Sequence, residues 1–307
     1  MPTINRRDFL TTVAACGTGL LLGACRQDAE SSLQTPTQPF WSGDLTRLAL
    51  IQDAVALMLA LPTVPSGLER ALGRTEGTPH MGLGLPPDLT AASLFAGTQK
   101  IGILGRLTDD PRDLYRIALA TGHFMHHVAE AQIGPALEAK GLRADRAEIQ
   151  RYQDAEVVRS LLPAPPATVA EAQALFEVLM LRLRLKAQAI MPDSLRPADW
   201  VLALLDWDAG QTTQVQALAA VVAAPDPVLQ ARYVRASAFF DANDPLVQRA
   251  RQPGAGGRTV PLAGPSLYAQ ALDACVGVLT EVGRFVEGVQ GANRLVQRLM
   301  ERLGTSV

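Results

Sequence analysis

The chain has 307 residues, of which 48% are hydrophobic, 19% are charged and 5% are aromatic, and its formal net charge is −2. An apolar content this high with so little charge excludes an intrinsically disordered chain, and the length is enough for one large hydrophobic core or two smaller ones. The basic residues are interspersed with nearly equal numbers of acids, so no nucleic-acid partner is expected.

The most specific pattern of the sequence lies at its N-terminus. The basic pair Arg6-Arg7 is followed by Asp8-Phe9-Leu10, and an uncharged stretch then leads to Cys25. A basic start followed by ~10–15 mostly apolar residues is typical of an export signal, whereas a stable transmembrane helix needs ~20 such residues. The sequence therefore predicts a leader that is removed and takes no part in the fold.

The paired arginines Arg6 and Arg7 resemble a twin-arginine export signal, and Leu22-Gly23-Ala24-Cys25 resembles the lipobox of bacterial lipoprotein precursors. This resemblance implies cleavage before Cys25, acylation of the Cys25 thiol and a mature protein tethered to a membrane of the cell envelope, facing the periplasm. Arg26 rather than Asp follows the cysteine. By analogy with enteric bacteria, this favours the outer membrane over the inner one. The alternative is an uncleaved N-terminal helix.

The resulting domain organisation starts with the export signal in residues 1–24 and continues with the lipidated cysteine and a flexible tether in residues 25–43. From Asp44 onward, capping residues and Pro or Gly stops predict one helix after another, so we expect an all-α fold, a multi-helix bundle. A proline-rich break near 163–166 separates helical subdomains 44–162 and 168–307, which form two packed bundles or one body.

Helices are expected over 44–61, 88–106, 110–133, 144–162, 168–190, 197–206, 211–224 and 227–241. The clearest periodicity, in 265–303, predicts a long C-terminal helix. Its apolar stripe comprises Tyr268, Leu272, Cys275, Leu279, Val282, Val286, Val289, Asn293, Val296, Met300 and Leu303.

This stripe is expected to pack within the bundle, with a seam for a partner helix or a second copy as the alternative. Cys275 on the stripe is interpreted as a small buried hydrophobic residue. The charged residues between the stripe positions, among them Glu281 and Arg298, are expected to form the solvent-exposed face of this helix. Glycines at 283, 288 and 291 mark places where the helix can bend or break.

Three of the four histidines lie in the segment Gly122–Glu130. On a helix, His123, His127 and Glu130 are one turn apart, and His126 is one turn from both His123 and Glu130, so the four side chains share one quadrant. This density of ligands suits a transition metal or a haem iron. The group lies opposite the apolar arc of its helix, however. That position favours a solvated polar face over a metal or cofactor site and over an acid–base group.

Three well-known motifs are absent from the sequence: the zinc-protease motif His-Glu-x-x-His, the haem-attachment motif Cys-x-x-Cys-His and the serine-hydrolase motif Gly-x-Ser-x-Gly. The sequence therefore favours a non-enzymatic binding or assembly role toward an envelope protein or an apolar ligand. The alternative is a metal- or haem-dependent redox or hydrolytic protein that uses His123, His126, His127 and Glu130.

Overall fold

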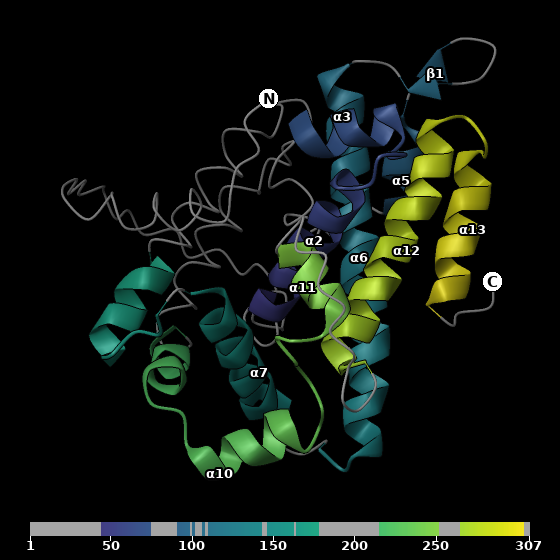
Figure 1. Cartoon of the computed structure of the whole chain (residues 1–307). Helices are drawn as coiled ribbons and strands as arrows, with labels where there is room; N and C mark the ends of the chain where they lie inside the picture. The colour runs from purple at the N-terminus through teal and green to yellow at the C-terminus, as the bar shows by residue number, and fades with distance from the viewer. Residues whose placement is uncertain are drawn as a thin grey trace, which may run out of the picture.

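The computed structural model of the protein describes residues 44–74, 91–98, 100–101, 106–107, 110–142, 146–162, 164–177, 215–251 and 265–303. The predicted export signal, Cys25, the tether and the helix expected over 197–206 lie outside this part of the chain. Within it, the fold is the predicted all-α multi-helix bundle (Figure 1). One antiparallel pairing of two-residue strands, β1 (Lys100–Ile101) and β2 (Arg106–Leu107), accompanies the helices.

Three helices form the centre of the bundle: α2 (Asp44–Leu59), α6 (Pro111–Ala139) and α12 (Leu267–Val286). Helix α12 packs along both α2 and α6, so the two ends of the described chain meet in the core. The surrounding elements are α3 (Ser66–Arg74), α5 (Ala91–Ala96), α7 (Arg146–Leu161), α10 (Pro227–Gln230), the π-helical η3 (Ala231–Arg235), α11 (Pro245–Arg251), α13 (Ala292–Arg302) and helical residues 169–177 and 215–223.

Several helices begin at capping residues that the sequence reveals. The carboxylate of Asp110 accepts a hydrogen bond from the backbone N–H of Arg112, with Pro111 in the first turn. The hydroxyl of Ser266 accepts from the N–H of Ala269 at the start of α12. These caps satisfy backbone donors that no helical carbonyl can reach.

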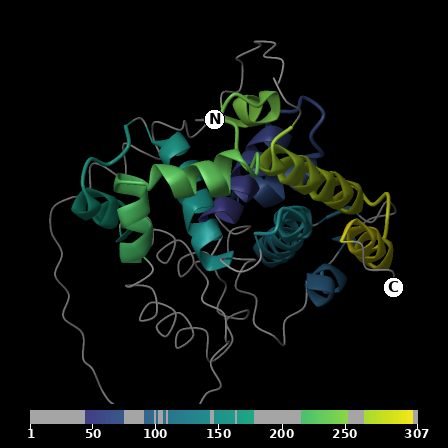
Figure 2. The ribbon, with the colours of Figure 1, turned by 90° about the horizontal axis from the view of Figure 1, so that it is seen from below.

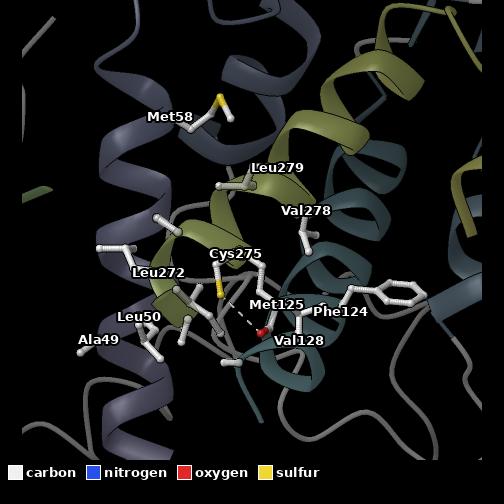
Figure 3. Close-up of a cluster of buried hydrophobic side chains, with 14 of the residues drawn as sticks. Ala49, Leu50, Met58, Phe124, Met125, Val128, Leu272, Cys275, Val278 and Leu279 are labelled. Carbon is white, nitrogen blue, oxygen red and sulfur yellow. Dashed lines mark hydrogen bonds between the residues drawn. The ribbon is translucent and has the colours of Figure 1, made fainter. Parts of the chain in front are cut away.

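Hydrophobic side chains gather in two clusters. The larger one joins α2, α6 and α12 and includes Leu50, Met125 and Leu279, each almost inaccessible to solvent (Figure 3). The smaller one joins the start of α2 and the end of α7 to residues 169–177 and 215–223. The larger cluster thus draws on residues before and after 163–166. The division into two subdomains stays a prediction.

Some predicted helix boundaries are wrong. The helix expected over 88–106 ends earlier, at Ala96, the last residue of α5 (Ala91–Ala96), and β1 and β2 follow. Gly97 directly after Ala96 is a residue that favours helix ends. Helix α6 does not stop at Gly134-Pro135 but continues to Ala139. Because Ile133 and Leu137 are buried on either side of this pair, tertiary packing offsets the cost of a proline inside the helix.

The long C-terminal helix expected from the stripe is two helices, α12 and α13, so the break at the glycines is confirmed. Gly288 adopts a φ of 76° in the turn, and Gly291 is the residue before α13. The stripe is buried up to Val286, whereas Val289 is 72% exposed. Helix α13 folds back beside α12 and also contacts α5 (Figure 2). It buries Leu295 and Leu299 in place of the predicted stripe positions.

None of the helices in the described ranges is both long enough and apolar enough to cross a membrane.

Candidate functional site

The histidine cluster, defined as His123, His126 and His127, lies on the central helix α6. The apolar arc of α6, which includes Ile117 and Phe124, is buried and fixes the helix in the core. The histidines are therefore presented on a rigid element, at the side of α6 that faces partly to solvent.

The three imidazole rings pack edge to face. The ring centroids of His123 and His127 are 4.4 Å apart, and those of His126 and His127 are 5.1 Å apart. His127 is exposed, whereas His123 and His126 are half-buried. Nδ1 of His126 is buried and forms no hydrogen bond within the described part of the chain. The solvated polar face expected from the sequence therefore describes His127 but not His126.

Helix α2 reaches this face through Arg47. Nη2 of Arg47 lies 2.5 Å from Oε2 of Glu130, and Arg146 at the start of α7 forms an ion pair with Oε1 of the same carboxylate. Glu130 is therefore shared by two arginines that come from helices on either side of α6 in the sequence.

The surroundings of the cluster disfavour charged imidazoles. Burial, together with the positive charge of Arg47 and the neighbouring imidazoles, lowers the pKa of His126 from 6.5 to about 2. Although part of the His127 side chain is exposed, partial desolvation of its ring, the His123 imidazole and Arg47 lower its pKa from 6.5 to about 4. A general acid or base is most effective when its pKa lies near the working pH. Neither imidazole is tuned for proton transfer at neutral pH.

The residues predicted as metal ligands lie near one another but do not form a ligand group. Among the described residues, no group of three or more His, Cys, Asp or Glu side chains is placed to hold a metal ion. Glu130 is engaged by Arg47 and Arg146, and their positive charges oppose the approach of a cation. A transition metal or haem at His123, His126 and His127 stays a prediction that these ion pairs disfavour.

Sequence reasoning did not identify the two arginines of this site. Arg47 precedes Glu130 by 83 residues and comes from another helix, so no local spacing connects them. The one available signal was the position of Arg47 among Leu45, Leu48 and other buried residues of α2. An arginine in such a stretch usually has a carboxylate partner.

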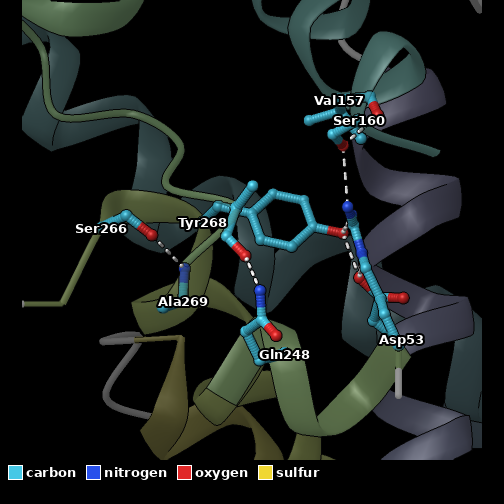
Figure 4. A network of polar contacts seen from close by, with 9 residues as sticks. Asp53, Val157, Ser160, Gln248, Ser266, Tyr268 and Ala269 are labelled. Carbon is cyan, nitrogen blue, oxygen red and sulfur yellow. Dashed lines mark hydrogen bonds and ion pairs between the residues drawn. The ribbon is translucent and has the colours of Figure 1, made fainter. Parts of the chain in front are cut away.

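A second polar group, the buried junction, consists of Asp53, Ser160, Arg251 and Tyr268 and connects α2, α7, α11 and α12 (Figure 4). Oδ2 of Asp53 accepts hydrogen bonds from the Tyr268 hydroxyl at 2.8 Å and from Nε of Arg251 at 2.9 Å. Nη1 of Arg251 donates to the Ser160 hydroxyl at 2.8 Å. The side chains of Asp53 and Arg251 are each only 7% exposed. One buried charge meets one opposite charge, which is the arrangement of a structural ion pair.

Cys275 is the buried hydrophobic residue that the sequence predicts. It is fully buried in the larger cluster, and its Sγ lies 3.5 Å from the carbonyl oxygen of Met125 (Figure 3). Burial raises the pKa of the thiol to about 12. The thiolate, which is the reactive form, is therefore scarce at neutral pH.

No protein-family model matches the chain, and neither the curated proteins nor the solved structures contain a match. The roles of these sites therefore rest on their own geometry and on the sequence.

Proposed function

We propose that the protein is an exported, lipid-anchored helical protein of the cell envelope with a binding or assembly role toward an envelope protein or an apolar ligand. The observation that carries the proposal is the order and spacing of two N-terminal sequence motifs. Arg6 and Arg7 precede an uncharged stretch that ends in the lipobox Leu22-Gly23-Ala24-Cys25. A basic pair, an apolar run and a lipobox in this order are what a lipoprotein precursor requires.

In this proposal, acylated Cys25 holds the helical body at the membrane through the tether of residues 25–43, on the periplasmic side and preferably at the outer membrane. The tether contains Pro36, Pro39 and Gly43 and is mostly polar between them. Such a composition suits a spacer between a lipid and a folded domain.

The electrostatics of the histidine cluster argue against acid–base catalysis at this site. The pKa values of His126 and His127 lie well below neutrality, and the Glu130 carboxylate is held by Arg47 and Arg146. An acid–base catalyst would have a pKa near 7, and a cation site would offer a free carboxylate beside its neutral imidazoles.

The anchor is tested by mass spectrometry of the protein purified from its native cells. We expect the mature N-terminus at Cys25 with a covalent lipid and the protein in the membrane fraction. The Cys25→Ala variant should remain unprocessed, and a double Arg6→Lys, Arg7→Lys variant should accumulate as precursor inside the cell. Arg26→Lys is the matched control and should be processed normally. An unlipidated wild-type chain that still begins before Cys25 would contradict the proposal.

The metal- or haem-dependent alternative is tested by elemental mass spectrometry of iron and other transition metals on the same preparation. We expect no stoichiometric metal in the wild type or in His123→Ala. Near-stoichiometric metal that disappears in His123→Ala would establish the alternative and overturn the proposed role.

A further inference from the structure

The arginine hairpin, defined as α12, α13 and the turn between them, gathers three arginines around one carboxylate. Nη1 of Arg298 lies 2.9 Å from Oε2 of Glu281, Nη1 of Arg284 lies 3.1 Å from Oε1, and Nη2 of Arg302 lies 3.9 Å from Oε1. Gln290 in the turn donates to the backbone carbonyl of Glu281 at 2.7 Å and fixes the return of the chain. The arrangement exists only because α13 folds back over the face that carries Glu281.

Positive charge exceeds negative charge in this group. One carboxylate balances one guanidinium, so two of the three positive charges have no counter-charge within it. Two other acids of the hairpin, Glu287 and Glu301, keep their negative charge but bond to uncharged donors and not to the three arginines: Glu287 accepts from the N–H of Gly67 at 3.5 Å and Glu301 from Gln297 at 3.1 Å. Within the described ranges, no other carboxylate forms an ion pair with these arginines.

The guanidinium groups are also accessible. The side chains of Arg284, Arg298 and Arg302 are 49%, 31% and 42% exposed, whereas that of Glu281 is 8% exposed. The carboxylate therefore lies beneath a layer of half-exposed guanidinium groups. Each of these groups carries five N–H donors, and Glu281 accepts only a few of them.

A glycine allows one of the three arginines to lie close to α12. A β-carbon at Gly277 would be 2.5 Å from Nη1 of Arg302, so the guanidinium of Arg302 lies against the bare backbone of α12 at this position. A side chain there would push Arg302 away from Glu281. Gly277 thus helps to bring the third positive charge into the group.

We propose that Arg284, Arg298 and Arg302 form a binding site for a phosphomonoester group. The two guanidinium charges that Glu281 does not balance match the charge of about −1.5 to −2 that such a group carries at neutral pH. The planar fork of a guanidinium pairs with two phosphate oxygens at once, which makes arginine well suited to phosphate recognition. Glu281 is a positioning residue that holds the guanidinium groups from below.

The phosphomonoester has two possible sources, a soluble phosphorylated molecule or the headgroup of an acidic lipid such as phosphatidic acid. The lipid source depends on the proposed membrane anchor, because the anchor would keep the hairpin close to a bilayer. The soluble source does not depend on it. Failure of lipid anchoring therefore leaves the phosphate site open to a separate test.

The site is tested by calorimetric titration of the protein as purified from its native cells in a neutral detergent, at about pH 7.5, where a phosphomonoester is close to dianionic. The probes are inorganic phosphate and, separately, detergent micelles doped with phosphatidic acid, with phosphatidylcholine micelles as the neutral control. Sodium chloride holds the ionic strength constant, because exposed charges are screened by salt.

We expect Arg298→Gln and Arg302→Gln each to weaken binding roughly tenfold or more, since each removes a charge-assisted hydrogen-bond donor. Arg235→Gln is the matched control, because Arg235 is an exposed arginine on η3 outside the hairpin, and it should leave binding unchanged. Arg284→Gln is a second variant should the α13 variants unfold, since it leaves Arg298 and Arg302 in place to hold α13 on Glu281.

Binding of both probes, lost in the hairpin variants, supports the site with a soluble ligand. Binding of phosphatidic acid micelles alone, lost in the same variants, supports the site with a lipid headgroup. If neither probe binds, or if Arg235→Gln weakens binding as much as the hairpin variants do, the proposal is overturned and the arginines serve only to hold α13 on α12.

Discussion

At the buried junction one carboxylate meets one guanidinium, whereas at the arginine hairpin one carboxylate meets three. Asp53 and Arg251 are both almost fully buried, and Tyr268 and Ser160 take up further hydrogen bonds around them. Glu281 is buried too, but its arginines remain accessible to solvent. The same residue types therefore make a closed structural contact in one region and an open, positively charged surface in the other. Charge balance and exposure distinguish the two.

The largest expected effect is at the buried junction. Asp53→Ala leaves the Arg251 guanidinium buried without its counter-charge, so we expect a loss of about 3–5 kcal/mol in the free energy of unfolding. Urea unfolding monitored by circular dichroism measures this loss. The double variant Asp53→Leu, Arg251→Met should recover much of it, because an apolar pair removes both charges. A single variant as stable as the wild type would show that the junction is not a closed ion pair.

The histidine cluster and the arginine hairpin should lose stability in different pH ranges. Because the pKa of His126 is lowered in the folded protein, this histidine is protonated below pH 6.5 in the unfolded chain but stays neutral in the folded one. The free energy of unfolding therefore falls as the pH drops below 6.5. The expected slope is about 1.4 kcal/mol per pH unit for this one proton. Urea unfolding at several pH values between about 6.5 and 4.5 checks it. His126→Gln should reduce the slope over this range, and His127, whose pKa is lowered to about 4, accounts for a part that remains.

Glu281 contributes to the pH dependence only in a lower range. Burial would raise the pKa of Glu281, but hydrogen bonds from Arg298 and Gln290 and the charges of Arg284 and Arg298 lower it below 4.5. Its stabilisation is therefore present above pH 4.5 and is lost as the pH falls through the lowered value. A loss between pH 6.5 and 4.5 that is as steep in His126→Gln as in the wild type would contradict the assignment to this histidine.

Removing the Glu281 charge should cost much less than removing that of Asp53. In Glu281→Gln the three arginines lose their shared carboxylate, but all are exposed enough to be solvated, so we expect a loss of only about 1 kcal/mol. Chemical unfolding of Glu281→Gln and Asp53→Ala, measured side by side, gives the difference directly. Equal losses in the two variants would remove the distinction between a closed and an open site.

The smallest expected effect on stability comes from Gly277→Ala. This variant should weaken phosphate binding at the hairpin without destabilising the fold. Alanine in the interior of α12 favours the helix by up to about 1 kcal/mol, and only the flexible end of Arg302 has to move. We expect a stability equal to or slightly above that of the wild type, with phosphate affinity reduced several-fold, roughly the size of one weakened charged hydrogen bond. Thermal unfolding and phosphate titration on one preparation check both. Unchanged affinity would show that Arg302 is not part of the site.

The fold class and several helix starts could be predicted from the sequence because they depend on local chemistry. The caps at Asp110 and Ser266 and the periodicity up to Val286 are visible in short windows of sequence. Beyond Val286 the period continues in the sequence, but the chain turns at Gly288 and Gly291. A pattern that repeats through a turn cannot show which of its positions will be buried once the chain reverses.

The arginine partners of Glu281 and Glu130 could not be predicted, because they too depend on how the chain reverses and packs. Glu281 was expected on the solvent-exposed face, and it is buried because α13 covers it. Glu130 was grouped with the histidines of its own helix, and its partners Arg47 and Arg146 come from α2 and α7. Which arginine reaches which carboxylate depends on how the helices pack, and that information is spread over the whole chain.

The packing of α12 between α2 and α6 also constrains when this protein can fold. The hydrogen bond between Tyr268 and Asp53 joins residues 215 positions apart, and the larger cluster lacks a central helix until α12 has been synthesised. Closing so long a loop is entropically costly and cannot be completed during translation of the N-terminal half. If the first residues are the proposed export signal, a core that is completed by the last helices suits a route that transports chains only after synthesis and folding are finished.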